Sequence, residues 1–554
     1  MNEYSRQLTD REMLELAMAE LDAAHQEITR LDAASAIGSQ SPLSGLSAVR
    51  SYMDVKQYDK AYIWACAMRE RMNGNTHFLR GLRDLQVKRG EISQTLLLAN
   101  AIAAKDKSIP PRSIRRLEGR LRELSGWVPS ITGGKRELEP PIAGRVLHLV
   151  KESRPFLSNG FTSRSHRNFI AEAKAGLEPI VVTEPGFPRE LVGSDFKRRE
   201  LVDDILHVRL DLGDIDYKQM PVDEYLEYFA QLAYEEVLRT RPSVIHASSG
   251  RRGYETALVG LSLKEKTGLP FIYEVRSFFE ANWTGDVAWE TSGEVFNRRM
   301  WVEEMCMHGA DRVLTIGVAM KEELISRGIP ESKIGIIPNA VDLADFVPKT
   351  RDGELSAKYH LDGFQTFGYV SNMDHYRESQ ETLIEACALM KDMGSESRCV
   401  LVGGGNRIPL LRKMAEDLGV SDRVVFTGAI DHKDIAKYYS LIDIFVVPRI
   451  RERAATYVTP LKPFEAMASG IPLVVSNLPA LVEIAEPPLR GESFVAGDPE
   501  SLADTLQRLY NDQEECRRMS ERSYEWVRTE RTWDSNGSRY VEEFRHLDQS
   551  QEVK

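Results

Sequence analysis

The sequence has few cysteines, no long apolar run and no excess of positive charge. Its five cysteines show no CxxC spacing, which argues against a zinc site or a disulfide framework and favours a reducing compartment. No apolar run reaches about eighteen residues, and the chain does not start with the pattern of a secretion leader. We therefore expect neither a membrane span nor export, and predict a cytoplasmic protein, either free or held at the inner face of the membrane.

The charge balance also limits the class of ligand. Lys and Arg number 72 against 84 Asp and Glu, which gives a net charge of −12. This balance argues against a nucleic-acid-binding protein, although it allows a local basic site for phosphate. The chain has 554 residues, 42% of them hydrophobic and 28% charged, which is typical of a globular protein of several domains.

Residues 1–137 carry helical patterns. Between Thr9 and Leu31, apolar residues recur at alternating steps of three and four, which predicts a short helical seam. Two later apolar stretches, "YDKAYIWACAMRERMNG" and "GEISQTLLLANAIAAKD", resemble two weak copies of a helical hairpin. We predict a helical region that serves packing or oligomerisation. The alternative is a groove for a peptide or protein partner.

From residue 138 onward, short β-branched runs alternate with amphipathic helices, which is typical of parallel α/β sheets. We predict two doubly wound, Rossmann-like domains, at 138–345 and 346–525, with a hinge near residue 345. The expected strands of the first domain are "RVLHLV", "EPIVVT", "SVIHASS", "PFIYEV" and "RVLTIG". Those of the second are "TFGYVS", "RCVLVG", "RVVFTG", "DIFVVP" and "IPLVVS".

Ligands of open α/β sheets bind beyond the carboxyl ends of the strands, where the second domain has glycines and cations. Gly403–Gly405 would let a ligand approach the backbone, or would only turn a strand into a helix. Lys462, between two prolines at a helix start, is the strongest candidate for a phosphate ligand, and the alternative is a solvated surface lysine. Arg449 ends a strand and would bind phosphate oxygens or form a salt bridge within its loop. Glu465 would cap a helix or accept hydrogen bonds from a ribose.

Several motifs in order carry a family resemblance. "KIGIIPNAVD", "CVLVGGGNR", "LIDIFVVPR" and "PLKPFEAMASG" resemble those of family 4 retaining glycosyltransferases with the GT-B fold, closest to exopolysaccharide-assembly members. The resemblance spans roughly residues 145–545. It implies a nucleotide sugar on the second domain, an acceptor on the first, and a C-terminal helix, residues 526–554, that crosses back to the first domain.

The resemblance assigns donor-binding residues by position. Glu465 matches the second glutamate of a paired-glutamate motif and would bind the ribose. The backbone of Ile430 would meet the nucleobase, and Gly404 would lie near the donor. Tyr457 stands where the family has its first glutamate, and the usual Arg and Lys after the first strand of this domain are not evident. Further donor-side candidates are Ser371, Asn372 and Thr459.

The same resemblance assigns residues in the first domain. Gly160 lies in a loop like the glycine loop beside the donor diphosphate, although a plain strand-to-helix turn would also explain it. His246 at a strand end would bind the donor sugar or orient the acceptor, or would be a structural histidine. Glu274 and Arg276 would form an acceptor clamp or an ion pair within their loop, and Arg164 is a further acceptor-side candidate.

The mechanism implied by the resemblance is a front-face substitution that retains the anomeric configuration. It needs no enzymic nucleophile, cofactor or metal; Lys462, Arg449 and His246 would act on the reacting groups. We expect a nucleotide-sugar donor, preferably a UDP-sugar, and a glycan, lipid-linked or protein acceptor. The alternatives are a sugar-nucleotide epimerase or phosphorylase on the same fold, and a non-catalytic scaffold.

Overall fold

The computed structural model describes residues 42–552, apart from 69–71, 73–74, 107–108, 135–137, 251–252 and 281–290. These residues divide into two compact units. The first contains the chain up to Trp127 together with Lys218–Tyr225 and Glu280–Val302, and the second contains the rest. The helical seam predicted between Thr9 and Leu31 lies outside the described residues. The predicted domain limits at residues 137, 345 and 525 stay predictions.

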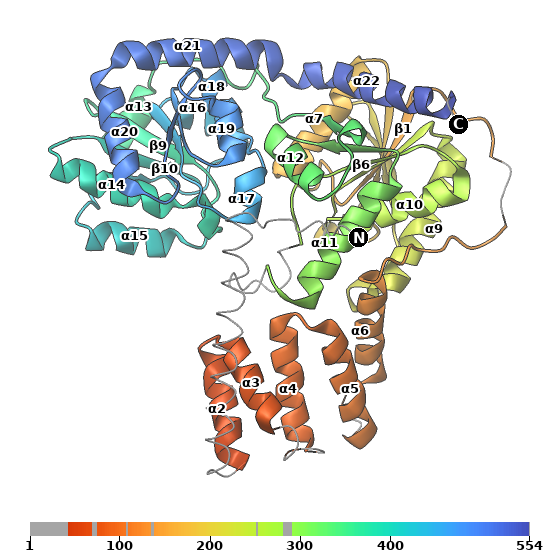
Figure 1. Ribbon diagram of the computed structural model, residues 1–554. Helices are drawn as coiled ribbons and strands as arrows, with labels where there is room; N and C mark the ends of the chain where they lie inside the picture. The colour runs from red at the N-terminus through yellow and green to blue at the C-terminus, as the bar shows by residue number, and fades with distance from the viewer. Residues whose placement is uncertain are drawn as a thin grey trace, which may run out of the picture. The chain divides into compact units, whose positions relative to one another are not determined.

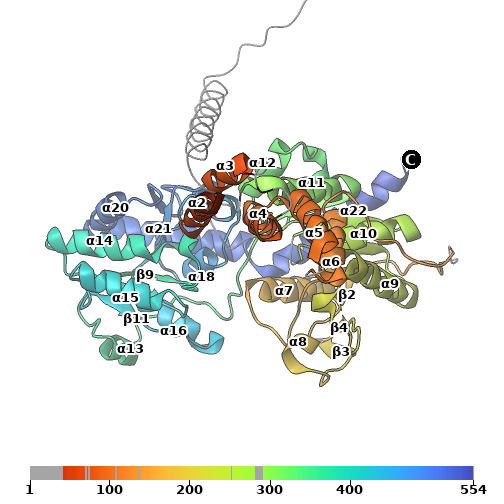
Figure 2. The same ribbon diagram turned by 90° about the horizontal axis from the view of Figure 1, so that it is seen from below.

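The first unit contains helices that pack on one another in chain order (Figures 1 and 2). The Asn75 side chain accepts a hydrogen bond from Phe78 N at the start of α4, and Gly90 ends that helix with a φ of 72°. Buried side chains such as Ala61 and Leu85 give these helices an apolar core of their own. The helices are α2 (Pro42–Asp54), α3 (Tyr58–Met68), α4 (Thr76–Arg89), α5 (Ile92–Asp106) and α6 (Pro111–Glu123).

The first α/β domain is built on an eight-stranded sheet in the order β3-β4-β2-β1-β5-β6-β7-β8. All neighbouring strands are parallel except β3 and β4, which pair antiparallel at one edge. The strands are β1 (Arg145–Val150), β2 (Glu178–Thr183), β3 (Arg199–Val202), β4 (Ile205–Arg209), β5 (Val244–Ser248), β6 (Phe271–Glu274), β7 (Arg312–Thr315) and β8 (Ile334–Ile336).

Helices connect these strands. Asn159 starts α7 with a reciprocal capping box, in which its side chain accepts from Thr162 N and the Thr162 hydroxyl accepts from Asn159 N. This cap fixes where the loop after β1 ends and α7 begins. The helices are α7 (Gly160–Lys174), α8 (Arg189–Val192), α9 (Val222–Thr240), α10 (Glu255–Thr267), α11 (Gly293–Gly309) and α12 (Val318–Ser326).

The second α/β domain is built on a six-stranded parallel sheet in the order β11-β10-β9-β12-β13-β14. Its central strands are buried along their length, which explains their continuous apolar sequences. The strands are β9 (Thr366–Val370), β10 (Arg398–Val402), β11 (Val424–Phe426), β12 (Ile444–Val447), β13 (Leu473–Ser476) and β14 (Glu492–Phe494).

The helices of this second domain precede a C-terminal pair, α21 and α22. Helix α22 lies beside α7 of the first α/β domain (Figure 1). There Phe544 and Leu547 pack against Val146 and Ile272 of the first sheet. The helices are α13 (Gly353–Lys358), α14 (Gln380–Asp392), α15 (Ile408–Asp417), α16 (Ile435–Tyr439), α17 (Arg453–Tyr457), α18 (Lys462–Ala468), α19 (Pro479–Ala485), α20 (Pro499–Asn511), α21 (Gln513–Glu530) and α22 (Trp533–Glu552).

The prediction of two parallel α/β domains is confirmed, since each sheet alternates with crossover helices. The ten expected strands all occur. Four strands were not predicted, namely β3, β4, β8 and β14. Among the described helices, none is both long and apolar enough to cross a bilayer.

Candidate functional site

A cavity of about 480 Å³ opens between loops that follow strands of both sheets. One side is formed by the start of α7 and by residues that follow β6 and β7. The other side is formed by the loops after β9 and β12, up to the first residue of α18. The volume suits a ligand of several hundred daltons. The carboxyl-end position agrees with the rule for open α/β sheets.

Lys462 lines this cavity from the first position of α18, where Pro463 follows it. Its Nζ lies 3.1 Å from Glu465 Oε2, and its side chain is 35% exposed. Glu465 is buried, and the Tyr439 hydroxyl donates to the same Oε2 at 2.6 Å. Lys462 therefore faces the cavity, while Glu465 lies behind it as its counter-ion; ribose binding by Glu465 stays a prediction.

Arg449 reaches the cavity from the end of β12, and a carboxylate binds it there. Its Nε and Nη2 donate to Glu378 Oε2 and Oε1 at 3.1 and 2.9 Å. The Tyr369 hydroxyl also donates to Glu378. Burial would raise the pKa of the Glu378 carboxyl, but Arg449 outweighs this effect and lowers that pKa. Arg449 thus forms a salt bridge, but with Glu378 after β9 and not within its own loop as the alternative prediction had it.

The glycine loop after β10 packs against the loop after β9. A Cβ on Gly403 would lie 2.0 Å from the Ser371 carbonyl oxygen, and one on Gly405 would lie 2.2 Å from the Met373 backbone. Gly404 accepts a hydrogen bond from Met373 N at 2.8 Å. These glycines therefore allow two backbones to meet. Gly404 is not among the residues that line the cavity.

Of the other predicted donor-binding residues of the second domain, some line the cavity and others do not. Ser371 and Asn372 line the cavity, and the Ser371 hydroxyl accepts from the Gln380 side chain at 2.9 Å. Ile430 is half-buried and packs against the apolar core. Tyr457 stands edge-on to Phe278, with 5.8 Å between the ring centroids.

Thr459 is buried at the edge of the cavity and is tied to the first α/β domain. Its carbonyl oxygen accepts a hydrogen bond from Asn339 Nδ2 at 2.7 Å. Asn339 belongs to the segment after β8. The loop that leads to Lys462 is therefore held by a residue of the "IPNAVD" motif.

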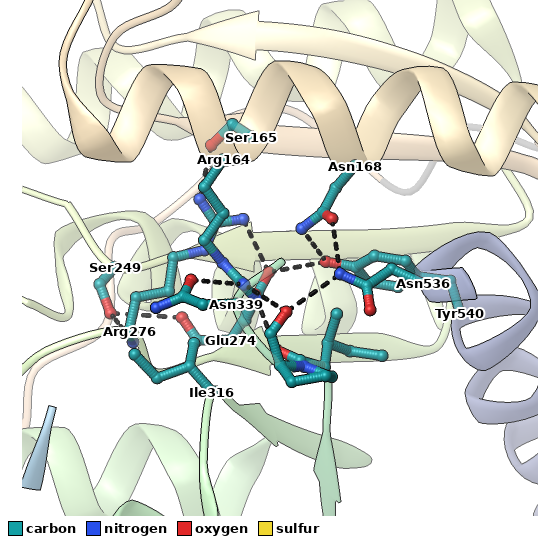
Figure 3. A network of polar contacts seen from close by, with 12 residues as sticks. Arg164, Ser165, Asn168, Ser249, Glu274, Arg276, Ile316, Asn339, Asn536 and Tyr540 are labelled. Carbon is teal, nitrogen blue, oxygen red and sulfur yellow. Dashed lines mark hydrogen bonds and ion pairs between the residues drawn. The ribbon is translucent and has the colours of Figure 1, made fainter. Parts of the chain in front are cut away.

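Three charged residues of the first α/β domain meet beside the cavity (Figure 3). Glu274 is fully buried; its Oε1 accepts from Arg164 Nη2 and its Oε2 from Arg276 Nη2, both at 2.7 Å. Burial would raise the pKa of Glu274, but the two guanidinium groups hold it well below its usual range. Arg164 and Arg276 line the cavity, so the predicted trio does come together, with Glu274 behind the arginines.

Of the three residues predicted to act on the reacting groups, His246 does not line the cavity. It is fully buried in β5, with Nε2 3.2 Å from Glu274 Oε2 and its ring 4.7 Å from that of His148. Burial lowers its pKa and favours the neutral imidazole. The expectation of a cleft-facing His246 is corrected, because the strand directs this side chain into the packing beneath the site. The structural alternative fits these contacts.

Gly160 lines the cavity as the first residue of α7. A Cβ there would meet its nearest neighbour, Leu461, at 3.8 Å, which is an ordinary contact.

Sequence reasoning did not single out Glu378 as the partner of Arg449, or Asn339 as the partner of Thr459. It also left Arg377, which lines the cavity, outside the predicted site.

The cavity is more positive than the chain that surrounds it. Its described lining contains Arg164, Arg276, Arg377, Arg449 and Lys462, with Glu378 as the carboxylate. Glu274 and Glu465 neutralise part of this charge from behind. In a protein with a net charge of −12, this excess of cations suits an anionic ligand. Within the described ranges, no group of three or more metal-ligating side chains is arranged to hold an ion, and the expectation that no metal or cofactor is needed stays a prediction.

Family models match both α/β domains in succession. The model described as "Glycosyl transferase 4-like domain" matches residues 167–340, and the model described as "Glycosyl transferases group 1" matches residues 354–526. Both α/β domains thus match family models of glycosyltransferase domains. In such a protein, the cavity lies where the two matched domains contribute their loops.

Two curated proteins that are similar to this chain are named for different donors. A GDP-mannose-dependent alpha-(1-6)-phosphatidylinositol monomannoside mannosyltransferase of Mycobacterium tuberculosis is 27% identical over 41% of this chain and 60% of its own length. A UDP-Gal:alpha-D-GlcNAc-diphosphoundecaprenol alpha-1,3-galactosyltransferase of Escherichia coli is 24% identical over 50% of this chain and 69% of its own. The chain thus spans about 60% of the length of the mycobacterial relative.

Solved structures share the fold of this chain. Sucrose-phosphate synthase of Thermosynechococcus elongatus superposes with a TM-score of 0.60 at 21% identity, over 73% of this chain and 99% of that one. HepE of Anabaena, in complex with UDP-glucose, superposes with a TM-score of 0.55 at 15% identity, over 73% and 99%. These likenesses show the GT-B fold.

Proposed function

We propose that this protein transfers a sugar from a nucleoside diphosphate donor to a hydroxyl group of an acceptor. The observation that carries the proposal is the cavity shared by the two α/β domains, whose lining has more cations than carboxylates. A diphosphate is the part of a nucleotide sugar that such a lining would bind most strongly. The family membership of both domains supports the same activity.

Lys462 is the residue we assign to the leaving diphosphate. Its partly exposed ion pair with Glu465 is worth about 1 kcal/mol or less, so a phosphate oxygen can replace the carboxylate at small cost. Arg377 adds a second cation on the same domain. Both charges would stabilise the negative charge that develops on the diphosphate as the glycosidic bond breaks.

We further propose that the reaction retains the anomeric configuration without a covalent intermediate. A double displacement needs a free carboxylate near the sugar. Among the described lining residues, Glu378 is the carboxylate, and Arg449 binds both of its oxygens. The departing diphosphate would then accept the proton of the acceptor hydroxyl, with the acceptor held on the side of Arg164 and Arg276.

For the donor we favour a UDP-sugar, with a GDP-sugar as the alternative, since the relatives include one of each. For the acceptor we favour a glycan, as in exopolysaccharide assembly, over a protein side chain. The full chain would be incubated with UDP- and GDP-sugars and with glycan, lipid-linked and peptide acceptors. We expect free nucleoside diphosphate and a product whose mass grows by one sugar, with the donor's anomeric configuration by NMR.

Two results would replace this proposal. An isomerised sugar nucleotide without transfer would indicate an epimerase. No turnover and no nucleotide binding, together with capture of a protein partner by the full chain, would indicate a scaffold.

A further inference from the structure

Helix α22 carries two buried polar side chains, one turn apart, on the face that packs against the first α/β domain. Asn536 is 0% exposed and Tyr540 is 1% exposed. Phe544 continues the same face into the apolar core. Buried polar groups destabilise a fold unless they are hydrogen-bonded, so their partners identify what these residues do.

The partners of Asn536 and Tyr540 lead toward the cavity (Figure 3). The Tyr540 hydroxyl lies 3.3 Å from Glu274 Oε2 and accepts from Asn168 Nδ2 at 3.2 Å. Asn536 Nδ2 donates to Asn168 Oδ1 and to the Pro338 carbonyl oxygen, both at 3.0 Å. Helix α22 therefore contacts both the carboxylate that holds the cavity arginines and the segment after β8.

Glu274 links Tyr540 to two side chains that line the cavity. Its Oε2 is shared by Tyr540 and Arg276, and its Oε1 binds Arg164. Arg276 is fixed further by Ser165, whose hydroxyl accepts from Nη1 at 2.5 Å. A shift of the carboxylate would thus move both guanidinium groups.

The same network reaches the loop of Lys462. The Pro338 carbonyl accepts from both Asn536 and Arg164, the latter at 2.9 Å. Arg164 Nη1 also donates to Asn339 Oδ1 at 2.9 Å, and Asn339 holds Thr459. Hydrogen bonds thus run without a break from α22 to the segment that precedes Lys462.

Arg276 also faces a second, smaller cavity. This cavity shares Arg276 and Phe161 with the large one, so the two adjoin. Ser248 lines it as well, and its buried hydroxyl has no hydrogen-bond partner among the described residues. A group bound there would lie beside a sugar in the large cavity, which is where an acceptor must be.

We infer that Tyr540 and Asn536 of the C-terminal helix are positioning residues, which act through Glu274 and Pro338 to hold Arg164 and Arg276 in line with the acceptor. The inference rests on the proposed transferase function. Their effect should fall on the alignment of the acceptor more than on donor binding, because Glu274 holds arginines of the first domain.

The test is Tyr540→Phe, which removes only the hydroxyl, with donor hydrolysis and sugar transfer measured in the same reaction. We expect the ratio of transfer to hydrolysis to fall about three- to tenfold, since one hydrogen bond to a charged group is lost. The donor Kd should stay within twofold. Misfolding would lower both rates together and leave their ratio unchanged, so the ratio separates positioning from stability.

Tyr510→Phe in α20 is the matched control, because its buried hydroxyl has no described partner. This variant should keep the ratio of wild type. Should Tyr540→Phe fail to fold, Asn536→Ser tests the link to Pro338 with the same readout. An unchanged ratio in a folded variant overturns the inference, whereas a wild-type protein that neither binds nor turns over nucleotide sugars overturns the proposed function instead.

Discussion

The two sides of the cavity hold their cations differently. In the first α/β domain, Arg164 and Arg276 are nearly inaccessible and share the one carboxylate of Glu274. In the second, Arg449 and Lys462 each have a carboxylate of their own, and the side chain of Lys462 is 35% exposed. The first side is thus fixed before a ligand arrives, while Lys462 can exchange its partner. We infer that the fixed arginines of the first side orient the ligand. On the second side, Lys462 exchanges its carboxylate partner for a group of the ligand.

The ion pair of Arg449 and Glu378 is the exception on the second side, because Glu378 is buried and the Arg449 side chain is only 13% exposed. Replacing Glu378 with Ala would leave the Arg449 charge without its carboxylate. We expect the free energy of unfolding to fall by about 3–5 kcal/mol, as for other buried pairs that lose one partner. Chemical denaturation measures this loss.

Asp417→Ala is the control for that experiment. It breaks the exposed pair with Lys413, and we expect no measurable change in the free energy of unfolding, because solvent screens this pair. Equal losses for the two variants would contradict the view that Arg449 and Glu378 form a buried structural pair.

Gly403, in the loop after β10, and Gly160, at the start of α7, provide the next contrast. Gly403→Ala would place a Cβ 2.0 Å from the Ser371 carbonyl oxygen at a φ of 137°, so two backbones must separate. We expect a loss of about 3 kcal/mol from overlap and backbone strain. Gly160→Ala, whose Cβ would make only an ordinary contact with Leu461 at 3.8 Å, should change the free energy of unfolding by less than about 0.5 kcal/mol. Similar melting temperatures for the two variants would refute the packing role of Gly403.

The sequence predicted the strands that are buried on both faces, and the reason is physical. Such strands need continuous apolar runs, as in "RVLHLV" and "DIFVVP". Strands β3 and β4 were not predicted because their edge pair carries charged residues, including Arg199 and Arg209. Strands β8 and β14 are three residues long, too short to show a pattern.

The sequence predicted site residues that can be recognised from their neighbours in the chain. It did not predict contacts between residues that are far apart in the chain. Lys462 stands out from its neighbouring prolines. Glu378 and Arg449 are 71 residues apart and meet because β9 and β12 are neighbours in the sheet. Tyr540 and Glu274 are 266 residues apart, and His246, predicted at a strand end, lies in the middle of β5 with its ring centroid 5.8 Å from that of Tyr540. Topology, which motifs do not encode, decides these contacts.

The first domain should also respond to acid more than the second. His207 accepts a hydrogen bond from Arg209 Nη1 at 3.1 Å, and burial together with this cation lowers its pKa to about 3. The unfolded chain therefore binds the proton more readily between about pH 6.5 and 3, and stability falls as the pH drops through this window. From pH 7 to 5 we expect a loss of about 2 kcal/mol from this group.

His207→Asn keeps an acceptor near the position of Nδ1 and cannot titrate in this range. Its free energy of unfolding should fall by about 2 kcal/mol less than that of wild type between pH 7 and 5. Parallel pH profiles for the two proteins would show that His207 is not the group responsible.

The most direct test of the account is calorimetric binding of UDP and GDP to wild type, Lys462→Ala and Lys413→Ala. Lys413 is an exposed lysine of the same domain, so its variant controls for the loss of charge. The account predicts that Lys462→Ala weakens nucleotide binding about ten- to hundredfold and that Lys413→Ala binds like wild type. Equal affinity in all three proteins would contradict the assignment of this cavity to the diphosphate.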